Sequence, residues 1–220
     1  MKTFYLIATI LSWAFSSFAQ AATVSDLLIT EIMANPNAVS DTQGEWFELF
    51  NPTAESIDIN GMVLSDDNNL GPVIASSTGV LINPGSYFVM ARSDDSTLNG
   101  GFTADYTYSR FSLGNTRDQI IISDSSGNFL RIDYGAGFVP NGGSMELIDT
   151  VMLAENYAAT TTVFGAGDFG TPGTAGSFIQ PRAPDTTPTP TPAPVPIPAA
   201  IWLMGSGLLG LTGFSRRRKA

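Results

Sequence analysis

Turn-forming residues divide the middle of this chain into short segments, and this division constrains its fold more than any other feature. Between residues 23 and 178 such residues recur roughly every 8 to 15 positions, as at Asn35-Pro36, Asn51-Pro52 and Asn83-Pro84-Gly85. The intervening runs are rich in branched and aromatic side chains, and none keeps a helical period. The sequence therefore predicts a single all-β domain.

Two hairpins are expected among these segments. Asn60-Gly61 suits the positive φ of a tight turn, so residues 57–59 are expected to pair with 62–65. The clearer hairpin joins 119–123 to 128–134 through Asp124-Ser125-Ser126-Gly127. The other expected strands are 27–34, 45–50, 80–82, 87–91 and 144–148. About nine short strands separated by turns predict a β-sandwich.

Side chains alternate along the segment 45–50. Because successive residues of a strand point to opposite faces, we expect Glu45, Phe47 and Leu49 to face the main core. The residues that alternate with them then share the other face, where a loop is expected to cover them.

Composition excludes several kinds of chemistry. The chain has no Cys and no His, so disulfides, thiol catalysis, serine triads and most zinc hydrolases are excluded. Residues 22–180 contain 19 Asp and Glu and four Arg, a net charge of −15. A surface this acidic repels phosphate backbones, so nucleic-acid binding is not expected. We expect no enzymatic activity.

Residues 1–21 have the pattern of a secretory signal helix. Lys2 precedes an apolar run, and the small residues Ala19 and Ala21 lie at the −3 and −1 positions of a cut before Ala22. This pattern predicts removal by signal peptidase. The alternative is a retained membrane anchor.

The other end of the chain combines a linker with a membrane segment. Residues 179–194 are rich in Pro and Thr, a composition that favours extended polyproline II. Residues 197–214 carry no charge and predict a transmembrane helix. The basic residues Arg216, Arg217 and Arg218 follow, and should stay on the cytoplasmic side.

Residues 195–220 resemble a known sorting signal. Val195-Pro196-Ile197-Pro198-Ala199-Ala200, the apolar run and the basic end occur in the order of the VPLPA variant of the PEP-CTERM signal, with Ile197 in place of Leu. The resemblance implies handling by an exosortase-type membrane enzyme in a Gram-negative bacterium and removal of the tail. The alternative is a plain tail anchor.

A second resemblance covers residues 22–178. Several segments occur in the order found in bacterial lamin-tail domains. They are Glu31-Ile32-Met33-Ala34-Asn35-Pro36, Gly44-Glu45-Trp46-Phe47-Glu48-Leu49-Phe50-Asn51-Pro52, residues 57–66, residues 82–91, Asp133-Tyr134, Gly143-Ser144-Met145-Glu146 and Gly170-Thr171-Pro172-Gly173. The resemblance implies an immunoglobulin-like β-sandwich. Leu147 stands where such domains often have Arg.

Four carboxylates in these segments are the candidate metal ligands: Glu31, Glu45, Glu48 and Asp58. Carboxylates and turn carbonyls suit a hard cation, so calcium is one interpretation. The other is that partly buried carboxylates accept backbone hydrogen bonds at strand ends. No other cofactor is expected, and no catalytic residue is identified.

These features together predict a non-catalytic exported protein, with an inner-membrane intermediate and a destination at the outer surface or in the extracellular matrix. Its expected partners are signal peptidase, the exosortase-type enzyme, the membrane through its C-terminal segment, and an exopolysaccharide or another surface protein. The alternative is a substrate- or calcium-binding accessory module for a secreted hydrolase.

Overall fold

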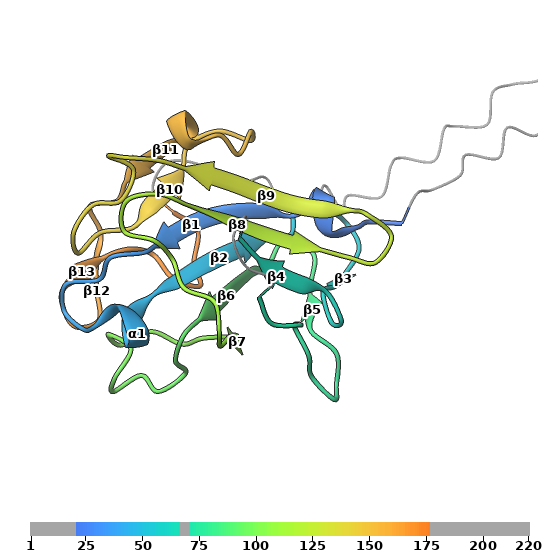
Figure 1. The fold of residues 1–220 in the computed structure, drawn as a ribbon, viewed down its shortest axis with the longest axis horizontal. Helices are drawn as coiled ribbons and strands as arrows, with labels where there is room; N and C mark the ends of the chain where they lie inside the picture. Colours follow the sequence, from blue (N-terminus) through green and yellow to red (C-terminus); the bar gives the residue numbers. More distant parts are fainter. Residues whose placement is uncertain (1–20, 67–70, 177–220) are drawn as a thin grey trace, which may run out of the picture. The chain divides into compact units, whose positions relative to one another are not determined.

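Short strands dominate the structure, as the spacing of turns predicts. The computed structural model describes residues 21–66 and 71–176 (Figure 1). Apart from the four-residue helix α1 and the 3-10 turns η1 and η2, the regular elements of those residues are all strands, which confirms the all-β class. In chain order the elements are η1 (Val24–Asp26), β1 (Leu28–Met33), α1 (Asp41–Gly44), β2 (Trp46–Phe50), β3 (Ile57–Asp58), β4 (Val63–Ser65), β5 (Leu81–Ile82), β6 (Tyr87–Ala91), β7 (Tyr106–Thr107), β8 (Asp118–Ser123), β9 (Phe129–Tyr134), β10 (Met145–Leu147), η2 (Ala154–Asn156), β11 (Tyr157–Ala159), β12 (Val163–Phe164) and β13 (Asp168–Phe169).

Two sheets form the layers of the domain. The larger has six strands in the order β11-β10-β1-β2-β6-β7, and the smaller has three in the order β4-β8-β9. Neighbouring strands are antiparallel except for the short parallel pair β6 and β7. The smaller sheet lies across one face of the larger (Figure 1), an arrangement consistent with an immunoglobulin-like sandwich.

The main core lies between the two sheets. Phe47 and Leu49 of β2 and Ile120 and Ile122 of β8 are fully buried in one hydrophobic cluster. Burying one such side chain stabilises the fold by roughly 1.5–3 kcal/mol. The expected inward direction of Phe47 and Leu49 is thereby confirmed.

A second, smaller core covers the outer face of the six-stranded sheet, the face turned away from the β4-β8-β9 sheet. Trp46 of β2 and Val89 of β6 are buried there together with Phe102, which comes from the loop before β7. The Trp46 ring centroid lies 5.7 Å from that of Phe102 and 6.1 Å from that of Phe164 in β12. The expected covering loop is present, and the β12–β13 hairpin adds to it.

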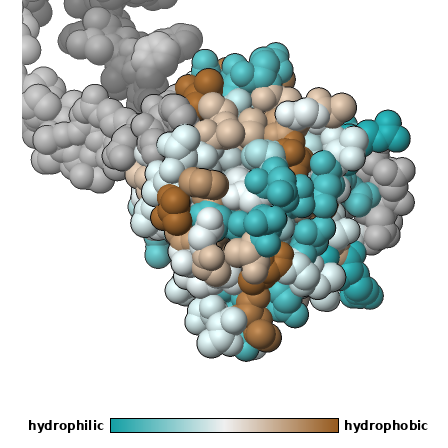
Figure 2. Space-filling model, turned by 90° about the vertical axis from the view of Figure 1, so that its left-hand side faces the viewer, coloured by the Kyte–Doolittle hydropathy of each residue, from teal (hydrophilic) through white to brown (hydrophobic). Residues whose placement is uncertain are grey.

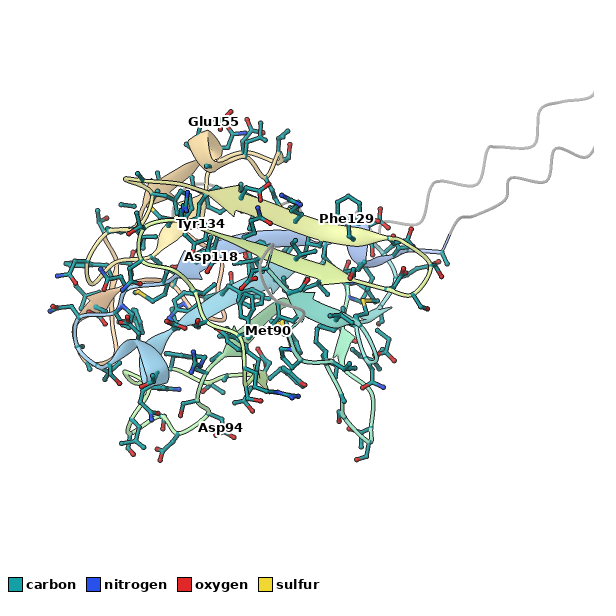
Figure 3. The ribbon with its side chains drawn as sticks, in the orientation of Figure 1. Met90, Asp94, Asp118, Phe129, Tyr134 and Glu155 are labelled. Carbon is teal, nitrogen blue, oxygen red and sulfur yellow. The ribbon has the colours of Figure 1, made fainter. Side chains whose placement is uncertain are left out.

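One expected hairpin is wrong and the other is confirmed. Asn60-Gly61 does form a turn, with φ of +85° at Gly61, but β3 pairs with β5 and β4 pairs with β8 in another sheet. The turn therefore carries the chain between sheets. The β8–β9 hairpin forms as expected, and its register places Ser123 opposite Phe129. Phe129 and Tyr134 mark the two ends of β9, the first exposed and the second buried (Figure 3).

The terminal segments lie outside this description. Apart from Ala21 and Ala22, the signal peptide and its cleavage site, the linker 179–194 and the sorting signal 195–220 fall outside the described residues. The expected transmembrane helix at 197–214 falls outside them as well. Within residues 21–66 and 71–176, no helix has the length and hydrophobicity needed to cross a membrane.

Candidate functional site

The four candidate metal ligands lie at separate places in the domain. Glu31 and Glu48 face each other on β1 and β2, on the outer face of the six-stranded sheet. Glu45 and Asp58 lie in separate hydrogen-bond networks elsewhere in the domain. Over the part of the chain that the structure describes, no group of three acidic residues is arranged to hold a metal ion.

Three glutamates from adjacent strands instead form a line across the outer face. Glu31 of β1 lies opposite Glu146 of β10 on one side and opposite Glu48 of β2 on the other. We call these three residues the glutamate row. Their exposed fractions are 1%, 3% and 1%. Burial of three carboxyl groups side by side is costly unless each is neutral or well supplied with hydrogen bonds.

The hydrogen bonds to the glutamate row come largely from residues 170–176, which we call the C-terminal strap. The backbone N–H of Thr171 donates to Glu31 Oε1 at 2.9 Å, and Thr171 Oγ1 donates to Glu31 Oε2 at 2.7 Å. The backbone N–H of Gly173 donates to Glu48 Oε2 at 2.7 Å. The strap is thus attached to two adjacent strands of the sheet through side chains.

Two hydroxyl groups complete the hydrogen bonding of these carboxyls. Thr30 Oγ1 donates to Glu48 Oε1 at 2.7 Å, and Ser144 Oγ donates to Glu31 Oε1. Thr30 lies in β1 and Ser144 directly precedes β10, so each of these two carboxyls joins this part of the domain to the strap.

Glycines allow the strap to lie this close to the sheet. A Cβ on Gly170 would lie 2.9 Å from Phe164 Cε1, 3.1 Å from Glu31 Oε1 and 3.1 Å from Trp46 Cζ2. A Cβ on Gly176 would overlap the Glu146 carboxyl. Glycine is the residue that permits such close backbone approach.

The protonation of the glutamate row follows from its burial. Loss of solvent raises the pKa of Glu48 to about 8; the bond from Thr30 opposes this rise and the nearby Glu31 adds to it. Burial likewise raises the pKa of Glu31, although the hydrogen bonds from Ser144 and Thr171 lower it. Glu48 is therefore mainly protonated at neutral pH, which lowers the repulsion within the row.

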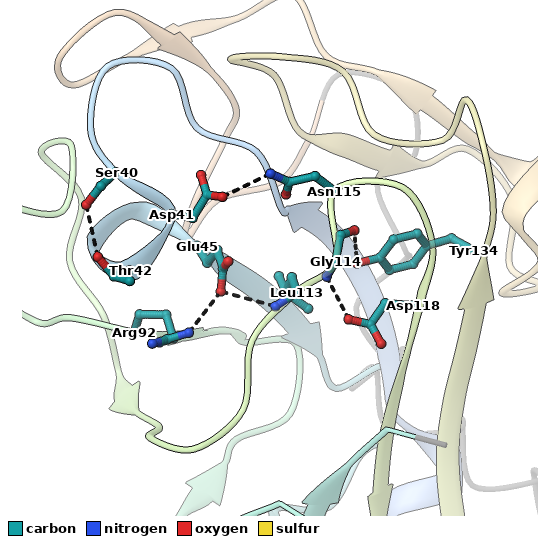
Figure 4. Close-up of polar contacts among 10 residues, drawn as sticks. All are labelled: Ser40, Asp41, Thr42, Glu45, Arg92, Leu113, Gly114, Asn115, Asp118 and Tyr134. Atoms are coloured by element: carbon teal, nitrogen blue, oxygen red, sulfur yellow. Dashed lines mark hydrogen bonds and ion pairs between the residues drawn. The ribbon is translucent and has the colours of Figure 1, made fainter. Parts of the chain in front are cut away.

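Glu45 belongs to a different network, which fastens the start of β2 to the loop before β8 (Figure 4). Its Oε2 accepts a hydrogen bond from the backbone N–H of Leu113 at 3.1 Å and forms an ion pair with Arg92 Nη1 at 3.3 Å. Burial raises the Glu45 pKa to about 7, although the bond from Leu113 and the charge of Arg92 lower it. The role of this carboxyl is to hold two segments together.

Asp58 supports a turn at the end of β3. Its Oδ1 accepts backbone hydrogen bonds from Asn60 at 2.9 Å and from Val80 at 3.0 Å. This geometry matches the interpretation in which carboxylates accept backbone hydrogen bonds at strand ends.

Sequence reasoning missed two members of this arrangement. Glu146 was not among the candidate residues, although it lies in one of the family-like segments, and neither was Thr171. Their shared role depends on strand neighbours that only the fold brings together. Leu147, next to Glu146, is buried in the main core.

Comparison with known protein families gives one match. A family model described as Lamin Tail Domain matches residues 20–136, which is more than half of the 220-residue chain. A search of curated proteins finds no match.

Proposed function

The chain belongs to the lamin tail domain family, and from this premise we propose that it is a non-catalytic exported protein whose sandwich is presented at the outer surface or in the extracellular matrix of a Gram-negative bacterium. Domains of this family are generally non-catalytic. The partners in this proposal are signal peptidase and an exosortase-type processing enzyme.

The observation that carries the proposal is the hydrogen bonding of the four candidate carboxyls, of which Glu31, Glu45 and Glu48 are buried. Glu31 and Glu48 are engaged by Thr171 and Gly173 of the C-terminal strap, so their oxygens hold the domain together. Glu45 and Asp58 likewise accept backbone N–H groups. These four groups are the candidate metal ligands of the sequence, and their bonding supports a structural role for them.

The position of the strap supports presentation through the C-terminal end. The fold is fastened as far as Gly176, directly before the Pro- and Thr-rich linker 179–194 and the sorting signal 195–220. The signal pattern of residues 1–21 and the order of Val195-Pro196-Ile197-Pro198 with the basic end support export and sorting.

Mass spectrometry of the protein isolated from its native host tests this proposal. We expect a mature N-terminus at Ala22 and a C-terminus close to residues 195–200, without Arg216 to Arg218. The double change Pro196→Ala and Pro198→Ala should leave the tail in place, because it alters the recognition segment without changing charge or hydrophobic length.

Ile197→Leu is the matched control, since it restores the usual residue of the motif and should leave processing unchanged. A surface-located chain that still ends in Arg218-Lys219-Ala220 would refute sorting and indicate a plain tail anchor. An intact chain in the cytosol would refute export.

A further inference from the structure

A pocket of about 570 Å³ lies on the outer face of the six-stranded sheet, beside the glutamate row. Three segments distant in sequence form it: the loop 101–105, the start of the β12–β13 hairpin, and the C-terminal strap. Tyr87 of β6 lines it and also borders the small cavity that contains Glu48 and Glu146. Its volume falls within the range of roughly 300–1,000 Å³ typical of small-ligand sites.

The walls of the pocket are fixed by hydrogen bonds before any ligand arrives. The backbone N–H of Ala166 donates to Gly100 O at 2.8 Å, which joins the hairpin to the loop. The N–H of Gly170 donates to Thr162 O at 2.7 Å, which joins the strap to the hairpin. Asp105 Oδ2 accepts the Val89 N–H at 2.7 Å, which joins the loop to the sheet. A preformed site loses little conformational entropy on binding.

Below these bonds, packed rings support the same walls. The ring centroids of Phe102 and Phe164 lie 6.2 Å apart, and both rings contact Trp46. A Cβ on Gly165 would overlap Gly100 O, so the hairpin and the loop meet at a place where only glycine fits. The pocket is therefore a built feature of the outer face.

The lining combines hydroxyl groups, aromatic rings and one carboxylate. Its threonines are Thr103, Thr162, Thr171 and Thr174, and its rings include those of Tyr87 and Phe164. Asp105 is the one charged side chain among the lining residues, and it keeps Oδ1 for a ligand because Oδ2 holds Val89. A lining with a carboxylate and no cation disfavours anionic ligands.

We propose that this pocket binds a neutral saccharide unit, an inference that rests on the proposed function as a non-catalytic surface protein. Sugar hydroxyls donate to Asp105 Oδ1 and to the oxygens of the threonine hydroxyls, while the C–H face of the sugar packs on an aromatic ring. The face of the domain shown in Figure 2 has its hydrophobic side chains in small groups among hydrophilic ones.

Calorimetric titration of the full chain tests the proposal, with the protein held in a detergent that has no sugar headgroup. The probes are cellotriose, maltotriose and mannotriose, with trigalacturonate as the anionic counterpart. We expect at least one neutral trisaccharide to bind and trigalacturonate to bind at least roughly tenfold more weakly, because its carboxylates meet Asp105.

Asp105→Asn should weaken binding of that trisaccharide roughly tenfold or more, since it replaces a charged acceptor. Asp58→Asn is the matched control: Asp58 is also exposed and also accepts the backbone N–H of a valine, Val80, but it lies outside the pocket. It should leave affinity unchanged. If Asp105→Asn does not fold, Thr103→Val serves instead, because Thr103 is exposed and lines the pocket.

Failure of all three neutral trisaccharides to bind would overturn the proposal, as would equal loss of affinity in the Asp105 and Asp58 variants. Preferential binding of trigalacturonate, or of a proline-rich peptide titrated in the same way, would also overturn it. None of these results bears on the mature termini found by mass spectrometry, so failure of the saccharide site is distinguishable from failure of export and sorting.

Discussion

At the scale of single residues, the buried glutamates are the unusual feature of this domain. A buried carboxyl costs free energy unless it is neutral or hydrogen-bonded, and Glu48 combines both conditions. Over the pH range between its two pKa values, Glu48 keeps a proton in the folded domain that the same residue loses in the unfolded chain. Stability should therefore depend on pH in the direction opposite to that of an ion-paired carboxylate.

The sign of this dependence follows from the two pKa values of Glu48. Burial raises the pKa from 4.5 to about 8, so between these values the folded domain binds a proton that the unfolded chain does not. The free energy of unfolding then falls as pH rises, by roughly 1.4 kcal/mol per pH unit for this group. We expect urea denaturation to give a lower free energy of unfolding at pH 8 than at pH 5.

Glu48→Gln should reduce the difference in the free energy of unfolding between pH 5 and pH 8. Glutamine is neutral at both pH values and can keep the hydrogen bonds to Thr30 and Gly173. Glu31 and Glu45 titrate in the same direction, so part of the difference should remain. Glu55→Gln, which changes an exposed glutamate, is the control and should leave the difference intact. A steeper fall of the free energy of unfolding from pH 5 to pH 8 in the Glu48→Gln variant would contradict this account.

At the scale of elements, the C-terminal strap covers part of the outer face of the six-stranded sheet although it is not a strand. It forms no ladder with the sheet; its backbone N–H groups donate to side chains of β1 and β2 instead. Such contact needs an approach closer than an ordinary side chain permits, and Gly170 and Gly176 both lie at points of this kind.

Gly170→Ala should lower the free energy of unfolding by about 1–3 kcal/mol, because the added methyl group meets Phe164, Glu31 and Trp46. Gly135→Ala is the matched control, since a Cβ there meets no atom within 4 Å. It should be neutral or slightly stabilising. Urea denaturation of the two variants measures the contrast, and equal stability would show that the strap is not held closely.

At the scale of the whole molecule, the fold extends beyond the residues that match the family model. That match ends at residue 136, yet β10 lies beside β1 in the six-stranded sheet, and Phe164 and the strap cover Trp46 and Glu31. A chain without these parts would expose an apolar face and buried carboxyls. The folding unit should therefore reach at least residue 176.

Three truncated chains test this boundary. Residues 22–178 should unfold cooperatively, whereas 22–136 should not, because exposure of the outer face costs roughly 1.5–3 kcal/mol per large apolar side chain against a total stability of about 5–15 kcal/mol. A chain ending at residue 169 keeps every strand and should fold with a lower melting temperature. Circular dichroism melts measure all three, and a cooperative melt of 22–136 at the temperature of 22–178 would refute the boundary.

The sequence by itself determined the local features of this protein: the strand class, most strand positions, the β8–β9 hairpin and the inward face of Phe47 and Leu49. These follow from backbone preferences and from the two-residue period of a strand, which neighbouring residues set. The exclusion of thiol and imidazole chemistry also follows from composition alone.

Only the tertiary structure decided which strands are neighbours, and with them the glutamate row, the strap and the pocket. The expected pairing across Asn60-Gly61 failed because a turn fixes the direction of the chain, whereas the sheet that each strand joins depends on distant partners. Glu31 and Thr171 are 140 residues apart in sequence. Their contact depends on how distant segments of the domain pack together, and no local pattern records that packing.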